Sequence, residues 1–312
     1  MFEKEYSWHE FVDKCDNNQN ITLLWNQSQE KRNYLQEFYD AIHKKCKSTD
    51  VAFTYNPDND KLVIEEKAYS IPTGIRKLLE NTQNTPIVIN ITTMNLKLLG
   101  ALLKYIKHAS YANIYCLYTE PKRYARKQES SGIFDLYRRM KSYEPIQGYV
   151  SMNISRRPEK WVPFLGFEGD RAIQIRELYD FTDCVPVITL PSYRPIWQNF
   201  IIRENLPLLG GLGCDSIHYV EADSILAAYE ELTRLSDVYK TSLLRVSPFG
   251  TKVNALGILL YALIHEGEID IVYDNPIEDG AAISVDIGNT HVYDITEYIN
   301  IAKKTMIQSQ KR

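Results

Sequence analysis

The sequence predicts an α/β protein made of two Rossmann-like halves with mainly parallel sheets. Short apolar strands alternate with helices of about 10–15 residues, a pattern typical of parallel sheets with helical crossovers. Two stretches that start about 155 residues apart resemble each other in sequence. The chain has 312 residues, more than the roughly 250–300 at which a single hydrophobic core stops growing. We therefore expect two domains.

The first half opens with a strand followed by a helix. The apolar run Ile21–Trp25 predicts a buried strand, and Gln29–Lys45 has apolar residues at helical spacing, with Ser28 placed to cap the helix. The turn-rich segment Asn56–Asp60 predicts a hairpin. The other elements expected here are the hairpin strands Val51–Tyr55 and Lys61–Glu65, a helix at Ile71–Leu79, a strand at Pro86–Ile91, a helix at Met94–Lys107, a strand at Ala112–Tyr118 and a helix at Ile133–Tyr143.

A loss of periodicity around Gln147–Arg157 predicts the domain boundary. Residues 1–150 are expected to form an N-terminal Rossmann-like domain, and residues 151–312 a C-terminal one that holds the ligand site. The second half is expected to contain strands at Trp161–Phe167, Val185–Leu190, Ser216–Val220, Ser242–Val246, Ile269–Tyr273, Ala282–Val285 and His291–Asp294, and helices at Asp170–Tyr179, Trp197–Glu204, Ala222–Leu235, Val253–Ile264 and from Glu297.

The two similar stretches are Val88–Pro121 and Leu243–Pro276. Each has an apolar strand, a small or polar turn, a helix with a central glycine (Gly100 or Gly257), and a strand that ends in Tyr-x-x-Pro. An internal duplication explains this match, and generic α/β construction is the alternative. A glycine inside a helix costs about 1 kcal/mol relative to alanine, so we expect close packing of each helix against its sheet.

Composition excludes several classes of protein. The chain is 44% hydrophobic and 24% charged, which is typical of a globular domain. Its net charge of −4 argues against broad coating of nucleic acid. No apolar run approaches the roughly 20 residues that span a bilayer, and Met1–Asp16 lacks the apolar core of a signal peptide. We expect a cytoplasmic protein without a membrane partner.

Cysteine and histidine spacing predicts no metal site. The five cysteines are dispersed without a CxxC pair, and the six histidines show no ligand spacing. Buried thiols in a reducing compartment are expected. Neither a GxSxG elbow nor a Ser-His-Asp or Cys-His arrangement is visible, so no catalytic residue is assigned and no cofactor is expected.

The most informative local feature is the turn Ser247–Lys252, between a predicted strand and a predicted helix. Open α/β sheets bind ligands at this carboxyl edge. Gly250 would let backbone amides approach a ligand, Thr251 would cap the helix, and Lys252 would stand in its first turn, where a cation is unfavourable unless an anion lies nearby. Phosphate binding explains all three residues. A capping turn with a solvated lysine is the alternative.

This strand, Gly-Thr-Lys turn and apolar helix resemble the ligand-binding signature of the CRISPR-associated Rossmann fold (CARF) family. The match covers Leu243–Tyr273, about a tenth of the chain. The resemblance implies that the turn helps to hold a cyclic oligonucleotide or related nucleotide in a homodimer, with a role in prokaryotic antiviral defence. The second glycine that the family usually has before Gly-Thr-Lys is Phe249 here.

Two further loops are expected at the same sheet edge. In the first, Glu168 and Asp170 could bind a ribose hydroxyl or a metal ion, and Arg171 could face a phosphate; stabilisation of the helix N-terminus is the alternative. The second contains Ser192, Tyr193 and Arg194 between two prolines, where arginine could bind phosphate and tyrosine could stack on a base. A rigid structural loop is the alternative. We expect both loops to converge with Gly250–Lys252.

Three hypotheses about function follow. The favoured one is a protein that binds or senses a nucleotide-type ligand. The second is an enzyme that acts on a nucleotide or its glycosidic bond, with Glu168, Asp170 or Glu120 as acid or base. The third is a subunit that docks nucleic acid or a protein partner through the basic run Lys122–Lys141, which is otherwise a solvated face.

Overall fold

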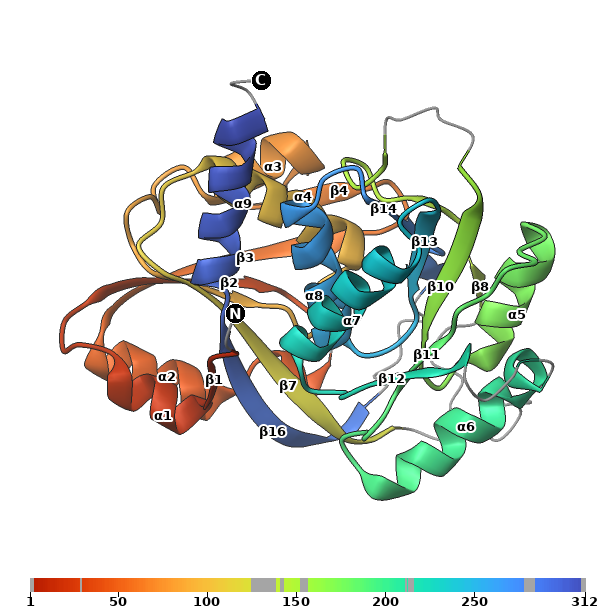
Figure 1. The fold of residues 1–312 in the computed structure, drawn as a ribbon. Helices are drawn as coiled ribbons and strands as arrows, with labels where there is room; N and C mark the ends of the chain where they lie inside the picture. Colours follow the sequence, from red (N-terminus) through yellow and green to blue (C-terminus); the bar gives the residue numbers. More distant parts are fainter. Residues whose placement is uncertain are drawn as a thin grey trace. The chain divides into compact units, whose positions relative to one another are not determined.

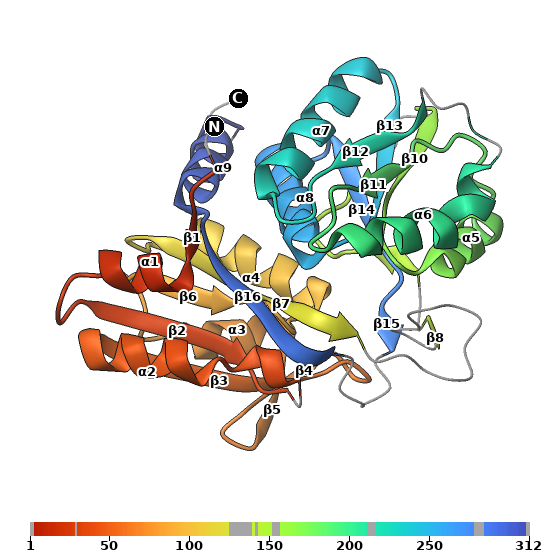
Figure 2. The same ribbon diagram turned by 90° about the horizontal axis from the view of Figure 1, so that it is seen from below.

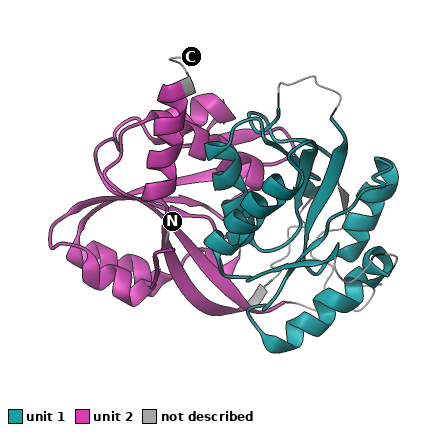
Figure 3. Ribbon diagram, in the orientation of Figure 1, with its two compact units in different colours: residues 1, 126–279 teal, residues 2–125, 280–312 magenta. Residues whose placement is uncertain are grey.

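The computed structural model describes residues 3–28, 30–124, 139–140, 143–151, 157–210, 212, 216–277 and 284–309. The chain divides into two compact units (Figure 3). The terminal unit comprises residues 2–125 and 280–312, and the central unit comprises residues 126–279. Both are α/β units with mostly parallel central strands, so the predicted fold class is confirmed.

The division differs from the expected domains 1–150 and 151–312. The C-terminal residues return to the first unit because strand β16 (Ser284–Asp294) pairs antiparallel with β7 (Ile114–Tyr124). The central unit is therefore inserted into the terminal one. Local periodicity identified a break in the pattern near residue 150, but it carried no information about this long-range strand pairing.

The terminal unit is built on an eight-stranded sheet in the order β1-β16-β7-β6-β2-β3-β4-β5. Its four inner strands β7, β6, β2 and β3 are parallel, and the outer strands pair antiparallel. Its other strands are β1 (Glu5–Ser7), β2 (Asn20–Asn26), β3 (Lys47–Asn56), β4 (Lys61–Ile64), β5 (Lys67–Ser70) and β6 (Ile87–Asn90). Its helices are α1 (Trp8–Lys14), the short 3₁₀ helix η1 (Lys31–Asn33), α2 (Gln36–Lys45), α3 (Ile71–Leu78), α4 (Leu96–His108) and α9 (Thr296–Ser309).

The central unit has a six-stranded sheet in the order β12-β11-β10-β13-β14-β9, in which only β9 runs antiparallel. A separate antiparallel pair joins β8 and β15. The strands are β8 (Arg139–Met140), β9 (Glu144–Pro145), β10 (Glu159–Leu165), β11 (Val187–Thr189), β12 (His218–Val220), β13 (Leu243–Pro248), β14 (Ile269–Tyr273) and β15 (Pro276–Ile277). The helices are α5 (Gly169–Leu178), α6 (Pro195–Leu209), α7 (Ile225–Val238) and α8 (Lys252–Ile264).

Helices cover both faces of each sheet (Figures 1 and 2). In the terminal unit α1 and α2 pack on one face around Phe11, Phe38 and Ile42, and α3, α4 and α9 lie on the other. In the central unit α5 and α6 cover one face, and α7 and α8 the other. Across the part of the chain that the structure describes, no helix is both long and apolar enough to cross a membrane.

Most predicted elements form close to their expected positions. The short strands β1, β5, β9 and β15 were not predicted, and four other differences follow. Ser28 does not cap a long helix: its hydroxyl accepts the Glu30 amide, and α2 begins later, at Gln36. Helix α1, with its capping box between Ser7 and Glu10, was not predicted. The two expected C-terminal strands are one strand, β16. The expected helix Ile133–Tyr143 falls largely outside the described residues, but its residues 139–140 form strand β8.

The two similar stretches adopt the same local topology. In each, a strand, a 13-residue helix and a parallel neighbouring strand follow one another: β6-α4-β7 and β13-α8-β14. The duplication itself stays a prediction. At Gly257 the close partner is helix α7 rather than the sheet, because a Cβ there would lie 2.5 Å from the Ile225 carbonyl oxygen and 2.9 Å from Ala228 Cβ.

Candidate functional site

The three predicted loops follow three adjacent strands of the central unit. Strand β10 lies between β11 and β13, with all three parallel. Their carboxyl ends therefore share one edge, which carries Glu168–Arg171 after β10, Ser192–Arg194 after β11 and Gly250–Lys252 after β13. Counted along the chain from β10, the order is 3-2-1-4-5, so the direction of winding reverses between β10 and β13. Ligands of open α/β sheets bind at such a switch point.

The loops approach one another closely because glycines occupy the contacts. A Cβ at Gly166 would lie 2.5 Å from the Phe249 carbonyl oxygen, and one at Gly250 would lie 2.7 Å from Thr189 Oγ1. A Cβ at Gly169 would lie only 1.8 Å from the Glu204 carbonyl oxygen on α6. The space beside these glycines is thus filled by protein. Their first role is to let the loops after β10, β11 and β13 pack together.

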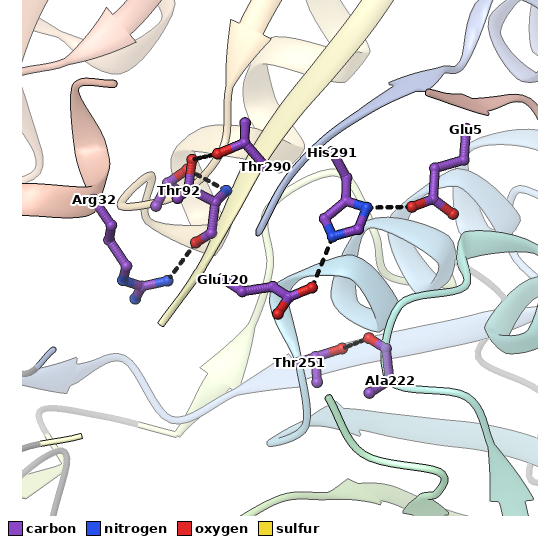
Figure 4. Close-up of polar contacts among 9 residues, drawn as sticks. Glu5, Arg32, Thr92, Glu120, Ala222, Thr251, Thr290 and His291 are labelled. Carbon is purple, nitrogen blue, oxygen red and sulfur yellow. Dashed lines mark hydrogen bonds and ion pairs between the residues drawn. The ribbon is translucent and has the colours of Figure 1, made fainter. Parts of the chain in front are cut away.

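Thr251 and Asn254 tie the turn before α8 to the loop after β12. The Thr251 hydroxyl caps α8 by accepting the Asn254 amide at 3.1 Å and donates to the Ala222 carbonyl at 2.6 Å (Figure 4). Buried Asn254 donates its side-chain amide to the carbonyls of Glu221 at 2.7 Å and Ser224 at 3.1 Å. Thr251 therefore fixes the turn. Sequence reasoning missed Asn254. The available signal was a polar side chain in the first turn of an otherwise apolar helix.

Arg171 is engaged by two carboxylates rather than open to solvent. Its Nε and Nη2 donate to the two oxygens of Asp274 at 2.6 Å each, and its Nη1 donates to Glu168. The side chains of Asp274 and Glu168 are only 1% and 8% exposed. This triad carries one net negative charge. It holds the loop after β10 against the end of β14, which favours a structural role for Arg171 over phosphate binding.

The loop after β11 supplies an arginine close to the switch point. Ser192 donates its hydroxyl to the Arg194 carbonyl at 2.6 Å, which closes the turn before α6. The Arg194 guanidinium lies 5.8 Å from the ring centre of Trp197, and its Nε is buried without a hydrogen bond among the described residues. Tyr193 is half-buried beside it. Both side chains stay candidates for ligand contact.

Lys252 and Asp170 stand in the first turns of two helices. Lys252 is the first residue of α8, directly after the cap Thr251, and is half-buried. Asp170 is the second residue of α5 and is exposed, where its carboxylate complements the positive end of the helix dipole. The backbone amides of the first turn of α8 add to the positive potential around Lys252. Lys252 and these amides together suit an anionic ligand.

The terminal unit contains a buried polar cluster that sequence reasoning missed. Arg32 donates to the Thr119 carbonyl at 3.0 Å, and Thr92 Oγ1 accepts the Thr119 amide at 3.1 Å (Figure 4). Asn90, at the end of β6, donates to the Asn33 carbonyl at 2.5 Å. The cluster links η1 to the carboxyl end of β6 and to the middle of β7. The available signal was Asn90, a polar residue near the end of the predicted apolar strand Pro86–Ile91.

Glu120 pairs with His291 instead of standing alone as an acid or base. His291 lies between Glu120, 2.7 Å from its Nε2, and Glu5 on the other ring nitrogen (Figure 4). Burial lowers the pKa of His291, but hydrogen bonds to Glu120 and Glu5 outweigh it and raise the pKa to about 9. The imidazolium therefore fastens β1 and β7 to β16.

Two remaining expectations concern metal ions and docking. Within the described residues, no group of three or more His, Cys, Asp or Glu side chains could hold a metal ion. Of the basic run Lys122–Lys141, Lys122 and Arg123 are exposed at the end of β7, where Arg123 pairs with Asp286 at 2.6 Å. Most of the run lies outside the described residues.

A scan of the chain against protein-family models finds no match, and a search of curated proteins finds no significantly similar sequence.

Proposed function

We propose that the protein binds a nucleotide-type ligand at the carboxyl edge of the central sheet and acts as a nucleotide sensor. The observation that carries this proposal is the reversal of strand order between β10 and β13, with the Gly250–Lys252 turn directly at the reversal. Dinucleotide-binding folds place their ligand at the same topological position. The resemblance to the CARF family extends the proposal to a homodimer with a role in antiviral signalling.

The charges around this edge suggest how the ligand is oriented. Lys252 and Arg194 supply two cations: Lys252 stands in the first turn of α8, whose amides add to its charge, and Arg194 lies in the loop after β11. Glu168 and Asp274 leave one net negative charge beside Arg171, which lies on α5, on the face of the sheet opposite α8. A phosphate is expected beside Lys252 and Arg194. Ribose hydroxyls would then face the carboxylate of Glu168.

Calorimetry with AMP and a cyclic oligoadenylate tests the proposal. Each of Lys252→Ala and Arg194→Ala removes a charge-assisted hydrogen bond to phosphate, which contributes about 1.5–3 kcal/mol, so each should weaken binding by roughly 10–150-fold. Lys240→Ala is the matched control. Lys240 is an exposed lysine of the same unit, but it lies just before β13, at the amino edge of the sheet.

Three outcomes would overturn the proposal. The first is that neither nucleotide binds. The second is that the double variant Lys252→Ala/Arg194→Ala binds as tightly as the wild type. The third is that the control Lys240→Ala weakens binding as much as the two site variants. Mass spectrometry of small molecules that co-purify with the wild type then identifies a ligand of another class. Circular dichroism of each variant confirms that the fold is retained.

A further inference from the structure

Cys15 and Cys46 lie together at the ends of two neighbouring helices of the terminal unit. Cys15 is the C-cap of α1, and Cys46 is the C-cap of α2. Both residues are buried, with 9% and 7% of their surface exposed, in the apolar cluster that joins these helices to the sheet. The two thiols influence each other, since the Cys46 thiol helps to raise the pKa of the Cys15 thiol. The second half of the chain has no such pair among its described residues.

The backbone holds these thiols together from both sides of Cys46. The Asn18 amide donates to the Lys45 carbonyl at 2.9 Å, and the Lys47 amide donates to the Gln19 carbonyl at 2.9 Å. The second of these bonds continues into the parallel pairing of β2 with β3. The segment after Cys15 is therefore fixed beside Cys46 by main-chain contacts rather than by a chance arrangement of side chains.

Side chains add three bonds to the same junction. Lys45 donates its ammonium to the carbonyls of Val12 at 2.7 Å and Asp13 at 2.8 Å, in the last turn of α1. The Cys46 thiol also lies 3.9 Å from the Asp16 carbonyl oxygen, next to Cys15 in sequence. These contacts hold the end of α1 against the end of α2.

We propose that Cys15 and Cys46 form a redox-responsive pair that closes to a disulfide when the protein meets an oxidised low-molecular-weight disulfide. The thiolate of one cysteine attacks a sulfur of the small disulfide and displaces one small thiolate. The thiolate of the other cysteine then attacks the mixed disulfide and displaces the second. Two S–H bonds are lost and one S–S bond forms. The two electrons and two protons reduce the small disulfide to two thiols.

Burial keeps this pair reduced and slow to react in the closed structure. It raises the pKa of the Cys15 thiol to about 12, and the neighbouring Cys46 thiol adds to that rise, so little thiolate exists near neutral pH. Reaction needs the seven-residue helix α1 to open and expose Cys15. Oxidation would then trap α1 against α2. The disulfide encloses β2, which lies between β3 and β6 in the sheet.

Peptide mapping of the oxidised wild-type protein is the direct test. The protein is incubated with oxidised glutathione, alkylated, digested and analysed by mass spectrometry before and after dithiothreitol. A reversible Cys15–Cys46 peptide is expected, with Cys116 and Cys184 recovered as free thiols. Because the link closes a loop of about 30 residues, the apparent Tm of the terminal unit should rise by roughly 5–10 °C.

Variants separate this pair from the other thiols. Cys15→Ser and Cys46→Ser should each abolish the linked peptide and the Tm rise, whereas Cys116→Ser, at a buried cysteine on β7, should retain both. The proposal is wrong if the oxidised wild type contains only mixed disulfides with glutathione, or links through any other cysteine. Since the mapping uses the wild-type protein, its result holds even where a serine variant fails to fold.

Discussion

Removing the guanidinium of Arg171 should lower the free energy of unfolding of the central unit by about 3 kcal/mol. Arg171 holds Asp274 through two hydrogen bonds of 2.6 Å and also pairs with Glu168. With the Asp274 side chain 1% exposed and that of Glu168 8% exposed, water cannot easily replace the guanidinium. Breaking a buried pair from one side costs about 3–5 kcal/mol. The lower end applies because Arg171 is itself 14% exposed.

Urea unfolding of the wild type and Arg171→Ala measures this loss. Hydrogen exchange followed by mass spectrometry then assigns it to the central unit rather than the terminal one. Arg203→Ala is the matched control, because Arg203 is 55% exposed and pairs with Glu204 on the surface of α6. Exposed pairs contribute about 0–1 kcal/mol, so the control should be nearly as stable as the wild type.

A second variant separates the lost ion pair from general disruption. Asp274→Asn combined with Arg171→Ala removes the buried carboxylate that has lost its two hydrogen bonds to the guanidinium, so the double variant should be more stable than Arg171→Ala alone. If Arg171→Ala loses no more stability than Arg203→Ala, the structural role is refuted. Arg171 would then be available to a ligand, as the sequence suggested.

Three further outcomes are expected. The pKa of His291 is raised from about 6.5 to about 9 in the folded protein. Its contribution to stability, roughly 2–3 kcal/mol, should therefore be present below pH 6.5 and lost as pH rises through 9. The free energies of unfolding in urea of the wild type and His291→Gln should converge above that pH. Gly257→Ala should destabilise by about 1–3 kcal/mol in thermal unfolding, despite the better helix propensity of alanine, since the added Cβ meets the Ile225 carbonyl. Thr251→Ala should cost about 1–2 kcal/mol, and Thr251→Ser should recover most of it, because the hydroxyl both caps α8 and donates to Ala222.

The placement of the three loops at one edge could be predicted from sequence because it depends on a regular rule. Loops that follow parallel strands leave the sheet at its carboxyl edge, so locating the strands before Glu168, Ser192 and Gly250 was sufficient to place them there. That their strands are neighbours required the order β11-β10-β13, and the structure has this order. Local periodicity also located most helices, because apolar residues recur every three to four positions along one helix face.

What local patterns could not predict are the contacts between distant segments. Arg171 and Asp274 are separated by 103 positions, so nothing near Arg171 indicates that its charge is already paired. The glycine at 250 indicated an approaching ligand, whereas its close neighbour is Thr189 at the end of β11, two strands away from β13. The return of β16 to β7 is of the same kind. Each depends on long-range packing that leaves no periodic signal in the sequence.

The pairing of Arg171 changes what the candidate site can recognise. Arg171 pairs with Asp274 and Glu168, so the other basic residues predicted for the site are Lys252, in the first turn of α8, and Arg194, in the loop after β11. An anion placed beside Glu168 would meet a net negative charge in a partly buried setting, where repulsion is screened only weakly. A ligand with its phosphate at Lys252 and its hydroxyls at Glu168 avoids that repulsion. Under the proposed function, a molecule with an anionic end and a neutral polar end, as a nucleotide has, should therefore bind more tightly than inorganic phosphate, which lacks the neutral end.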